Sequence, residues 1–326
     1  MATGLFVCGF FPALLDVRLI TMGLRGGRNK LPQGLYNDTQ DLDQVRIFAN
    51  LPLGFYPKTY RSILNAYDGL GIYRNVSAGA GGSFDYQVFG GRVDDTGSDT
   101  FLVDGIDSEF IDAQGWNIRG VWGAHLTWNT PLAGLKAVCS YTLYPNSTMS
   151  SSLVLNPMLP PVPANAESLD LTYWVGGLEY TWGDLTLAAE AKWMEMDGIS
   201  KMPPMMGGDS PFHRDLFFAY LSAAYQVTDR LGLGAYYGYE DDNDGGHEIA
   251  DLDVTQDWCA AVSYNLTSWW ILKFETHWLD GVGILYSVPD ANDLPVQLPP
   301  GAIPPPGVQI TNDDWFYFVL KTTLSF

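Results

Sequence analysis

The 326-residue sequence contains no hydrophobic run that is long enough for a transmembrane helix. Such a helix needs about 20 consecutive, predominantly apolar residues. The longest apolar stretch, residues 3–15, is shorter than this, and polar residues interrupt every later stretch. The sequence therefore predicts that no helix of this chain spans a membrane.

Basic residues are also scarce. The chain has 17 Lys and Arg residues against 37 Asp and Glu residues, which gives a formal net charge of −20. Nucleic-acid binding requires a basic surface that neutralises phosphates. We therefore expect no nucleic-acid partner, and we interpret many of the acidic residues as belonging to solvated loops.

Residues typical of catalytic and metal sites show no recognisable spacing. The three cysteines, Cys8, Cys139 and Cys259, are too few and too scattered for a disulfide framework. Cys139 and Cys259 fall inside predicted strands, where we interpret them as small wall residues. The four histidines lack a pattern such as H-E-x-x-H, and no nucleophile elbow, Walker loop or dinucleotide fingerprint is present. The sequence therefore predicts no enzyme, no cofactor and no histidine-based metal site.

What the chain does contain is a C-terminal stretch that alternates between two faces. Every second residue from Phe316 to Phe326 is apolar or neutral, whereas Lys321, Thr323 and Ser325 fall on the other face. A period of two predicts a β-strand. An apolar edge strand invites aggregation in a soluble protein, whereas a closed membrane barrel requires this apolar outer face and polar inner face.

Two kinds of connection alternate strictly along the sequence. Five short ones cover residues 76–81, 130–134, 182–184, 228–230 and 266–268. Six long ones, rich in Asp, Pro, Gly or Met, cover residues 29–67, 93–113, 145–167, 197–213, 241–253 and 281–312. In bacterial outer-membrane barrels short turns face the periplasm and long loops face the outside. The pattern predicts an outer-membrane location with the C-terminus in the periplasm.

Between these connections the sequence predicts twelve strands. They cover about residues 16–28, 68–75, 82–92, 114–129, 134–144, 168–182, 184–195, 214–227, 231–240, 254–266, 268–280 and 314–326. Single-chain barrels have even strand numbers. The predicted fold is therefore an all-β, transmembrane antiparallel β-barrel that forms a single domain over residues 1–326.

Residue parity within the strands separates a lipid face from a lumen face. Residues 268–280 place Trp270, Phe274 and Trp278 on one side, and Lys273, Glu275 and His277 on the other. Trp270 and Trp278 are eight residues apart, a spacing that matches the apolar band between two aromatic girdles. The predicted girdle residues are Trp116, Trp128, Trp174, Trp182, Trp270, Trp278 and Phe326.

The segment from Arg25 to Asp41 carries a family resemblance. A strand with basic residues runs into Leu31-Pro32-Gln33-Gly34-Leu35-Tyr36-Asn37-Asp38. Together with the hairpin at residues 225–234 and the terminal Phe326, this resembles the Gram-negative general porins, particularly the phosphate-selective-porin-like group. The resemblance implies a trimeric, water-filled channel of sixteen strands in which the loop at residues 29–67 folds into the pore.

The resemblance also implies a set of pore-lining charges, in which opposed acidic and basic groups would set selectivity. The loop and its entry strand contribute Arg25, Arg28, Lys30, Asp38, Asp41, Asp43 and Arg46, and the wall contributes Arg119, Glu190, Lys192, Lys273 and Glu275. Basic residues are too few for a dedicated phosphate site, so we expect a weak preference for cations.

The first fifteen residues are atypical for such a barrel, because they lack a basic start and a clear signal-cleavage site. We interpret the chain as N-terminally truncated, with twelve strands of a parent that has sixteen. The residues Glu240, Asp242, Asp244 and Asp251 approximate a calcium-loop spacing, although an acidic hairpin loop is the simpler interpretation.

The sequence thus predicts an outer-membrane porin that passes small hydrophilic solutes and ions, contacts lipid and lipopolysaccharide, and forms a homotrimer. One alternative is a non-conducting barrel with a structural or adhesive role, or a sleeve for a partner protein. A second alternative is an outer-membrane hydrolase, for which His213 near Asp209 and Ser210 is the only indication.

Overall fold

The computed structural model describes most of the chain. The described residues are 5–7, 15–18, 22–52, 54–56, 65–93, 111–153, 160–204, 207–243, 254–281 and 315–325. The strands are β1 (Leu5–Val7), β2 (Leu15–Arg18), β3 (Gly23–Lys30), β4 (Ala66–Ser77), β5 (Ser83–Arg92), β6 (Ile111–Asn117), β7 (Val121–Asn129), β8 (Leu135–Leu153), β9 (Val162–Pro163), β10 (Asn165–Trp182), β11 (Leu185–Lys201), β12 (Ser210–Gln226), β13 (Leu231–Asn243), β14 (Val254–Thr267), β15 (Trp270–Asp280) and β16 (Trp315–Leu324). Three 3-10 helices are η1 (Asn37–Thr39), η2 (Asp43–Val45) and η3 (Gly79–Gly81). None of the helices in these residues has the length and apolarity that a membrane crossing requires.

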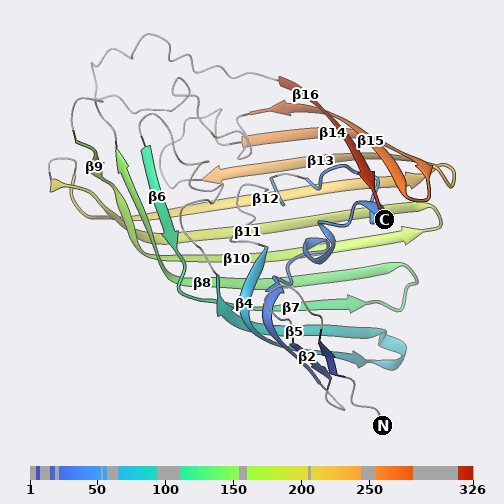
Figure 1. The fold of residues 1–326 in the computed structure, drawn as a ribbon, viewed down its shortest axis with the longest axis horizontal. Helices are drawn as coiled ribbons and strands as arrows, with labels where there is room; N and C mark the ends of the chain where they lie inside the picture. The colour runs from blue at the N-terminus through green and yellow to red at the C-terminus, as the bar shows by residue number, and fades with distance from the viewer. Residues whose placement is uncertain are drawn as a thin grey trace.

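All sixteen strands belong to one sheet in which each strand pairs antiparallel with its neighbours. The order follows the sequence from β1 to β16, except that β6 and β9 lie off this path and pair with β8. The sheet curves strongly, so that it has a concave and a convex face (Figure 1). Within the described residues, β1 and β16 stand at its two ends and are not paired with each other. The predicted all-β antiparallel class is confirmed.

The predicted alternation between the two faces is also confirmed, most clearly in β15. Lys273, Glu275 and His277 are buried on the concave side, whereas Trp270, Phe274 and Trp278 are exposed on the convex side. The terminal strand behaves in the same way, with Phe316, Phe318 and Leu320 between 65% and 78% exposed. Large apolar side chains on a convex surface need a cover that is itself apolar, and lipid provides one.

Aromatic residues of neighbouring strands are aligned on the convex side by the strand register. Trp174 is paired with Trp193, which is paired in turn with Phe217, and Trp278 lies between Trp258 and Phe316. Nearer the short turns, Trp128 is paired with Phe84 and stacks against it. Trp182 and Trp270 are likewise exposed near the short turns. Phe326 lies outside the described residues.

The prediction for Trp116 as a girdle residue is wrong. The chain breaks between β6 and β7, so that residues 114–129 form two strands instead of one. Trp116 pairs with Met149 far along β8, and its side chain is buried in a concave-side cluster that includes Ile118 and Val121. The break shifts the phase of the alternation, because residues 118–120 leave the ladder and the strand parity restarts after them.

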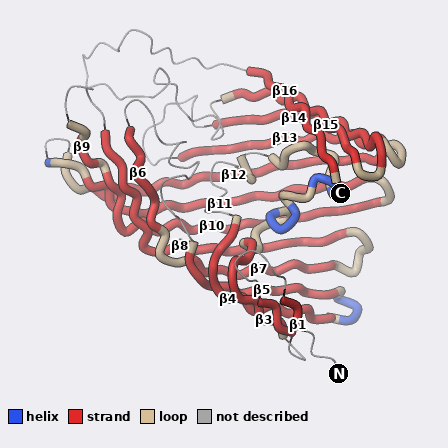
Figure 2. The backbone as a smooth tube through the Cα atoms, in the orientation of Figure 1, coloured by secondary structure: helices blue, strands red, loops and turns tan. Residues whose placement is uncertain are grey.

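Several predicted boundaries are also corrected. Residues 16–28 form two antiparallel strands, β2 and β3, in place of a single one. Much of the predicted loop at residues 145–167 is strand, because β8 and β10 stay paired as far as Met149 and Ala166. The predicted loop at residues 197–213 is likewise shortened to residues 202–209, since the β11–β12 ladder runs out to Ser200 and Ser210. The five predicted short turns are all present (Figure 2).

Candidate functional site

A segment that is not part of the wall lies across the concave face of the sheet. We call residues 31–56 the inner segment; its residue 53 is outside the described set. It leaves the end of β3, passes through η1 and η2, and crosses the face toward β15 and β16 (Figure 1). Leu31, Phe48, Ala49, Leu51 and Phe55 are at least 92% buried. The segment is therefore packed against the wall and is not a free surface loop.

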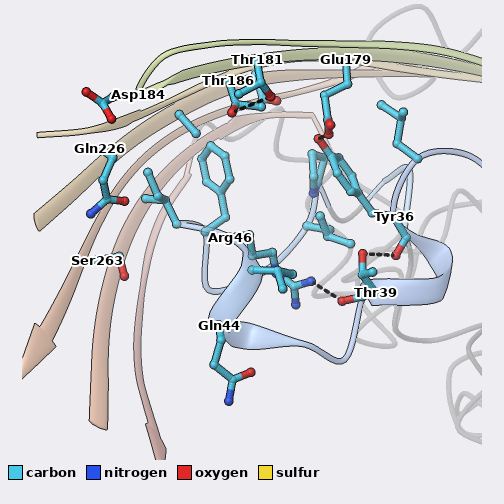
Figure 3. A pocket seen from close by; sticks show the side chains of 18 of the residues that line it. Tyr36, Thr39, Gln44, Arg46, Glu179, Thr181, Asp184, Thr186, Gln226 and Ser263 are labelled. Atoms are coloured by element: carbon cyan, nitrogen blue, oxygen red, sulfur yellow. Dashed lines mark hydrogen bonds between the residues drawn. The ribbon is translucent and has the colours of Figure 1, made fainter. Parts of the chain in front are cut away.

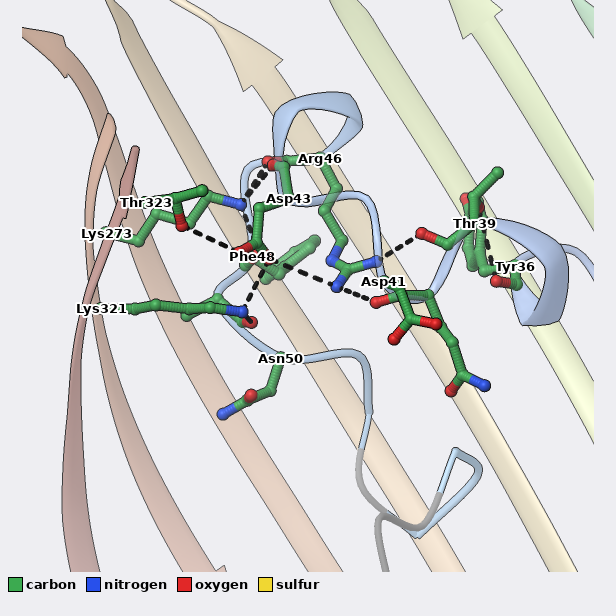
Figure 4. A network of polar contacts seen from close by, with 12 residues as sticks. Tyr36, Thr39, Asp41, Asp43, Arg46, Phe48, Asn50, Lys273, Lys321 and Thr323 are labelled. Atoms are coloured by element: carbon green, nitrogen blue, oxygen red, sulfur yellow. Dashed lines mark hydrogen bonds and ion pairs between the residues drawn. The ribbon is translucent and has the colours of Figure 1, made fainter. Parts of the chain in front are cut away.

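The side chain of Lys273 attaches the inner segment to β15. Its Nζ atom donates hydrogen bonds to the main-chain carbonyl oxygens of Asp43, Arg46 and Phe48, at 2.7, 2.8 and 2.9 Å (Figure 4). Two residues further on, the Oε1 atom of Glu275 accepts hydrogen bonds from the amides of Ala49 and Asn50, at 2.6 and 3.3 Å. A buried, irregular segment must satisfy both its main-chain carbonyl oxygens and its main-chain amides. Here Lys273 binds the carbonyl oxygens and Glu275, on the same strand, binds the amides.

Asp43 joins the inner segment to the terminal strand. Its Oδ1 atom accepts a hydrogen bond from Lys321 Nζ at 2.7 Å, and its Oδ2 atom accepts one from Thr323 Oγ1 at 2.8 Å (Figure 4). Arg46 lies 3.6 Å away as a second cation. Burial acts to raise the pKa of Asp43, but the hydrogen bonds from Lys321 and Thr323 and the nearby cations together lower it below its usual value.

A second attachment is built around Glu190 on β11. Its Oε1 atom accepts a hydrogen bond from the amide of Leu35 at 2.7 Å, and its Oε2 atom accepts the hydroxyls of Tyr56 and Tyr220, the latter at 2.5 Å. The amide of Gly34 donates to Ser140 Oγ at 3.1 Å. Gly34 has φ +59°, where a side chain is disfavoured, and a Cβ atom there would clash with the Glu190 carboxylate. The close approach of this loop to the wall therefore requires glycine.

Lys192 completes this second attachment. Its Nζ atom donates a hydrogen bond to the carbonyl oxygen of Phe55 at 2.7 Å. The same ammonium lies 4.3 Å from the ring centroid of Phe218 and 5.0 Å from that of Phe55. A cation held against aromatic faces in a desolvated place gains from their quadrupoles. The buried wall charges Glu190, Lys192, Lys273 and Glu275 therefore all contact the inner segment directly.

The predicted charges on β3 and η1 form a third group. Lys30 Nζ lies 2.9 Å from Asp41 Oδ2 and donates to the carbonyl oxygen of Asp38 at 3.1 Å. Burial raises the pKa of Asp38, an effect that Arg25 and Lys30 partly offset. Arg25 lies over the ring of Tyr73, 4.4 Å from its centroid. The structure thus brings acidic and basic candidates together here, with one of them as a direct ion pair.

Two predicted constriction residues lie elsewhere. Arg28 is three residues from Arg25, so the two fall on opposite faces of β3, and Arg28 is exposed and 3.7 Å from Asp68. Arg119 lies in the break between β6 and β7 and is exposed. Neither contacts the inner segment through an interaction seen in the described residues. Their assignment to a constriction is therefore not supported by their positions.

The weak calcium-loop prediction is also altered by the fold. Glu240 and Asp242 are part of β13, because this strand continues to Asn243. The Glu240 side chain is buried on the concave side, near Gly54 of the inner segment. Asp244 and Asp251 lie outside the described residues. Glu240 thus belongs to the wall under the inner segment and not to an acidic hairpin loop.

A cavity of about 570 Å³ lies between the inner segment and the short-turn ends of the wall. Its wall side carries polar side chains of β10, β11, β12 and β14, and its segment side carries Gln44 and Arg46 (Figure 3). Tyr36 donates a hydrogen bond to Glu179 across it, and burial together with this carboxylate raises the pKa of Tyr36. Lys136 lies 2.9 Å from the other oxygen of Glu179.

A second cavity of about 510 Å³ lies beside β3, β4 and β5. It is lined by polar and charged groups of both signs, including Arg25, Arg74, Asp38 and Asp85. His125 faces this cavity from β7, and its ring nitrogens contact Ser140 Oγ and Thr127 Oγ1 at 2.8 and 2.9 Å. Both cavities are therefore polar spaces on the concave side, next to the inner segment.

The only sequence indication of a hydrolase does not form a catalytic arrangement. His213 is exposed on β12, and its two ring nitrogens contact carboxylates of Asp197 and Asp215 at 2.8 and 3.1 Å. Asp209 pairs instead with Lys201 at 2.5 Å. A histidine bound on both sides by carboxylates has no nitrogen available to activate a serine.

Several attachment residues were not predicted from the sequence as site residues. They are Ser140, Tyr56, Tyr220, Lys321 and Thr323. Lys321 and Thr323 already fell on the polar face of the predicted terminal strand, and that signal could have identified them. The positions of Tyr56 and Ser140 depend on the path of the inner segment, for which the sequence pattern gives no signal.

Comparisons with known proteins agree with this architecture. No family model and no curated protein matches the chain. Among solved structures, outer-membrane-expressed OmpT of Vibrio cholerae matches with TM-score 0.55 and 14% identity, covering 96% of this chain and 80% of that chain. The in-vitro folded trimer form of OmpT from Vibrio cholerae matches with TM-score 0.51 and 16% identity, covering 83% of this chain and 70% of that chain. The chain therefore has the fold of an outer-membrane β-barrel.

Proposed function

We propose that this protein is an outer-membrane porin, a passive diffusion channel for small hydrophilic solutes and ions. The observation that carries the proposal is the inner segment, which the buried wall charges hold across the concave face. A barrel that served only as a structural support or an adhesin would have no need for a polar interior that is partly obstructed by an ordered segment. Catalysis is not part of the proposal, because the hydrolase candidate His213 has both ring nitrogens on carboxylates.

The inner segment would act as the constriction of this channel. Polar cavities of about 570 and 510 Å³ lie beside it, and each is lined by groups of both charge signs. Charged rings and constrictions of this kind set the size and charge selectivity of pores. Because most of the buried charges are used to hold the segment, we assign them a positioning role, and we assign ion contact to Arg25, Asp38 and Asp85. The net charge of −20 favours a weak preference for cations.

The two faces support a proposed placement in the cell. The apolar convex side would contact lipid and the long connections would contact lipopolysaccharide, while the short turns and the C-terminus would lie in the periplasm. We also propose a homotrimer, the form named for one of the OmpT structures of Vibrio cholerae. The narrower assignment to the phosphate-selective-porin-like group stays a prediction from the sequence.

Planar-bilayer recordings of the folded, heat-modifiable protein test the proposal. We expect stable ohmic conductance steps with a modest preference for cations, and swelling of liposomes in solutions of small sugars. A folded barrel that gives neither conductance nor swelling would refute the channel function and favour a structural barrel or a sleeve for a partner protein. Cross-linking in detergent micelles, read as the mass of the cross-linked species, tests the trimer separately.

A further inference from the structure

Three side chains of types that bind metal ions meet on the concave side of β14 and β15. Cys259 on β14 is paired directly with His277 on β15, and Glu275 lies two residues before His277 on the same face. All three are at least 96% buried. One potential ligand atom from each residue lies within 4.8 Å of the others. These residues lie beneath the inner segment and are not part of the proposed ion path.

The distances between the ligand atoms fit a metal ion better than they fit hydrogen bonds. His277 Nε2 is 3.7 Å from Cys259 Sγ and 3.5 Å from Glu275 Oε2. A good N–H···O hydrogen bond is shorter than the second distance. Tetrahedral Zn²⁺ has bonds of about 2.3 Å to sulfur and about 2.0–2.2 Å to nitrogen or oxygen, which places neighbouring ligand atoms about 3.3–3.6 Å apart. The two distances from His277 Nε2 are close to this geometry, and the remaining separation, between the Cys259 and Glu275 ligand atoms, is within 4.8 Å.

The surrounding residues orient the histidine as metal sites require. His277 Nδ1 is 3.1 Å from Asp257 Oδ1, and Asp257 in turn accepts a hydrogen bond from the Tyr236 hydroxyl at 2.7 Å. An Nδ1–H that donates to a carboxylate leaves the Nε2 lone pair available for an ion. The Tyr317 ring stacks on the imidazole with centroids 4.1 Å apart and fixes its plane. This carboxylate–histidine arrangement is the usual outer shell of a zinc ligand.

The charges of the three ligands also suit a dication. A Cys259 thiolate and a Glu275 carboxylate supply two negative charges and neutral His277 supplies none, so one Zn²⁺ would balance the charges of the three ligands. Burying such charges without a counter-charge is costly. The thiolate and imidazole donors select against Ca²⁺ and Mg²⁺, which prefer oxygen ligands.

We propose that Cys259, Glu275 and His277 bind one Zn²⁺ ion, with Asp257 as the positioning residue for His277. Glu275 Oε1 holds the amides of Ala49 and Asn50, so only Oε2 is needed for the ion. The bound ion therefore fixes the carboxylate that holds the inner segment. Zinc stabilises the attachment of the segment to β15, and the ion acts as a structural part of the constriction.

Metal analysis of the full-length chain tests this proposal without reference to conduction. The protein is folded in detergent with and without ZnSO₄, dialysed against metal-free buffer, and analysed by inductively coupled plasma mass spectrometry. We expect about one Zn²⁺ per chain after folding with zinc. Replacement by Co²⁺ should give the near-ultraviolet thiolate-to-cobalt band that reports a Cys ligand.

Matched variants identify the ligands. Cys259→Ser and His277→Gln should abolish retention of the ion, whereas Cys139→Ser, at an exposed free cysteine of the same wall, should retain it. Asp257→Asn should weaken binding about 10–100-fold, as expected for the partner of a ligating histidine. Near-stoichiometric zinc in Cys259→Ser, or no zinc in the wild-type protein folded in its presence, would overturn the proposal. Heat-modifiable migration of each variant shows that its barrel has folded.

Discussion

The attachment of the inner segment by Lys273 gives the sharpest test of how the constriction is held. We consider the substitution Lys273→Met, which keeps the length of the side chain and removes the ammonium. In the structure this ammonium donates to three carbonyl oxygens at 2.7–2.9 Å, and the residue is 1% exposed. The substitution therefore leaves three main-chain acceptors in a buried place without their donor.

The magnitude follows from two opposing terms. Each hydrogen bond to a charged group contributes about 1.5–3 kcal/mol, whereas burial of the ammonium itself costs several kcal/mol. Removing one partner of such a buried set generally destabilises by about 3–5 kcal/mol. Taking about 3 kcal/mol for the local effect, the population of chains with a detached segment rises roughly 100-fold, since about 1.4 kcal/mol corresponds to a factor of ten.

Hydrogen exchange of residues 43–49, measured by mass spectrometry, reports this detachment directly. We expect faster exchange there in Lys273→Met while the wall strands stay protected, and single-channel recordings with larger and noisier conductance. Lys201→Met is the control, because Lys201 is a half-buried cation that pairs with Asp209 and makes no contact with the inner segment among the described interactions, and it should change neither readout. If Lys273→Met exchanges and conducts like the wild-type protein, the anchoring role of this lysine is wrong.

Three further changes test the loop geometry, its charge and the membrane face. Gly34→Ala should destabilise the folded barrel by about 1–3 kcal/mol more than Gly183→Ala, because both glycines have φ +59° but only Gly34 lies against a carboxylate. Urea titration of the two variants measures the difference in their free energies of unfolding. The pKa of Asp43 is lowered in the folded chain, so the stabilisation by its charge is fully present above the unfolded pKa of about 3.9 and is lost as pH falls through the lower folded pKa. Protease cleavage of the inner segment should therefore rise only below about pH 4. Asp43→Asn should show this acid level of cleavage already at neutral pH. Phe274→Arg, midway along the convex face of β15, should reduce the folding free energy in lipid by about 2–4 kcal/mol and Trp278→Arg by only about 0–1 kcal/mol. Equal costs for these two arginines would contradict the assigned depth of the membrane band.

The period of two in the sequence by itself determines the fold class and the faces of the wall. In β15 and β16 it separated Lys273 and Lys321 from Phe274 and Phe318, because strand side chains alternate strictly and the two sides of this wall have different surroundings. The same rule failed at Trp116. A break in the ladder resets the parity, and the residues that make it, 118–120, carry no strong turn signal in the sequence.

Pairing within the β14–β15 hairpin could not be counted from its turn. Thr267 is paired with Trp270 across residues 268–269, and an unbroken ladder from there would place Cys259 opposite Trp278. A register shift between Asn265 and Thr267 places Cys259 opposite His277 instead. A spacing along one segment, such as H-E-x-x-H, also cannot reveal a pair that meets across two strands.

Only the tertiary structure decided what the buried charges do. The sequence placed Glu190, Lys192, Lys273 and Glu275 on the polar face and left them as candidates for ion contact. In the folded chain they bind main-chain and tyrosine groups of a segment about 135–230 positions away in the sequence. Local patterns report which face a side chain occupies, but its partner depends on the path of an irregular segment through the interior. That path is fixed by many weak, long-range contacts together, and no spacing in the sequence encodes it.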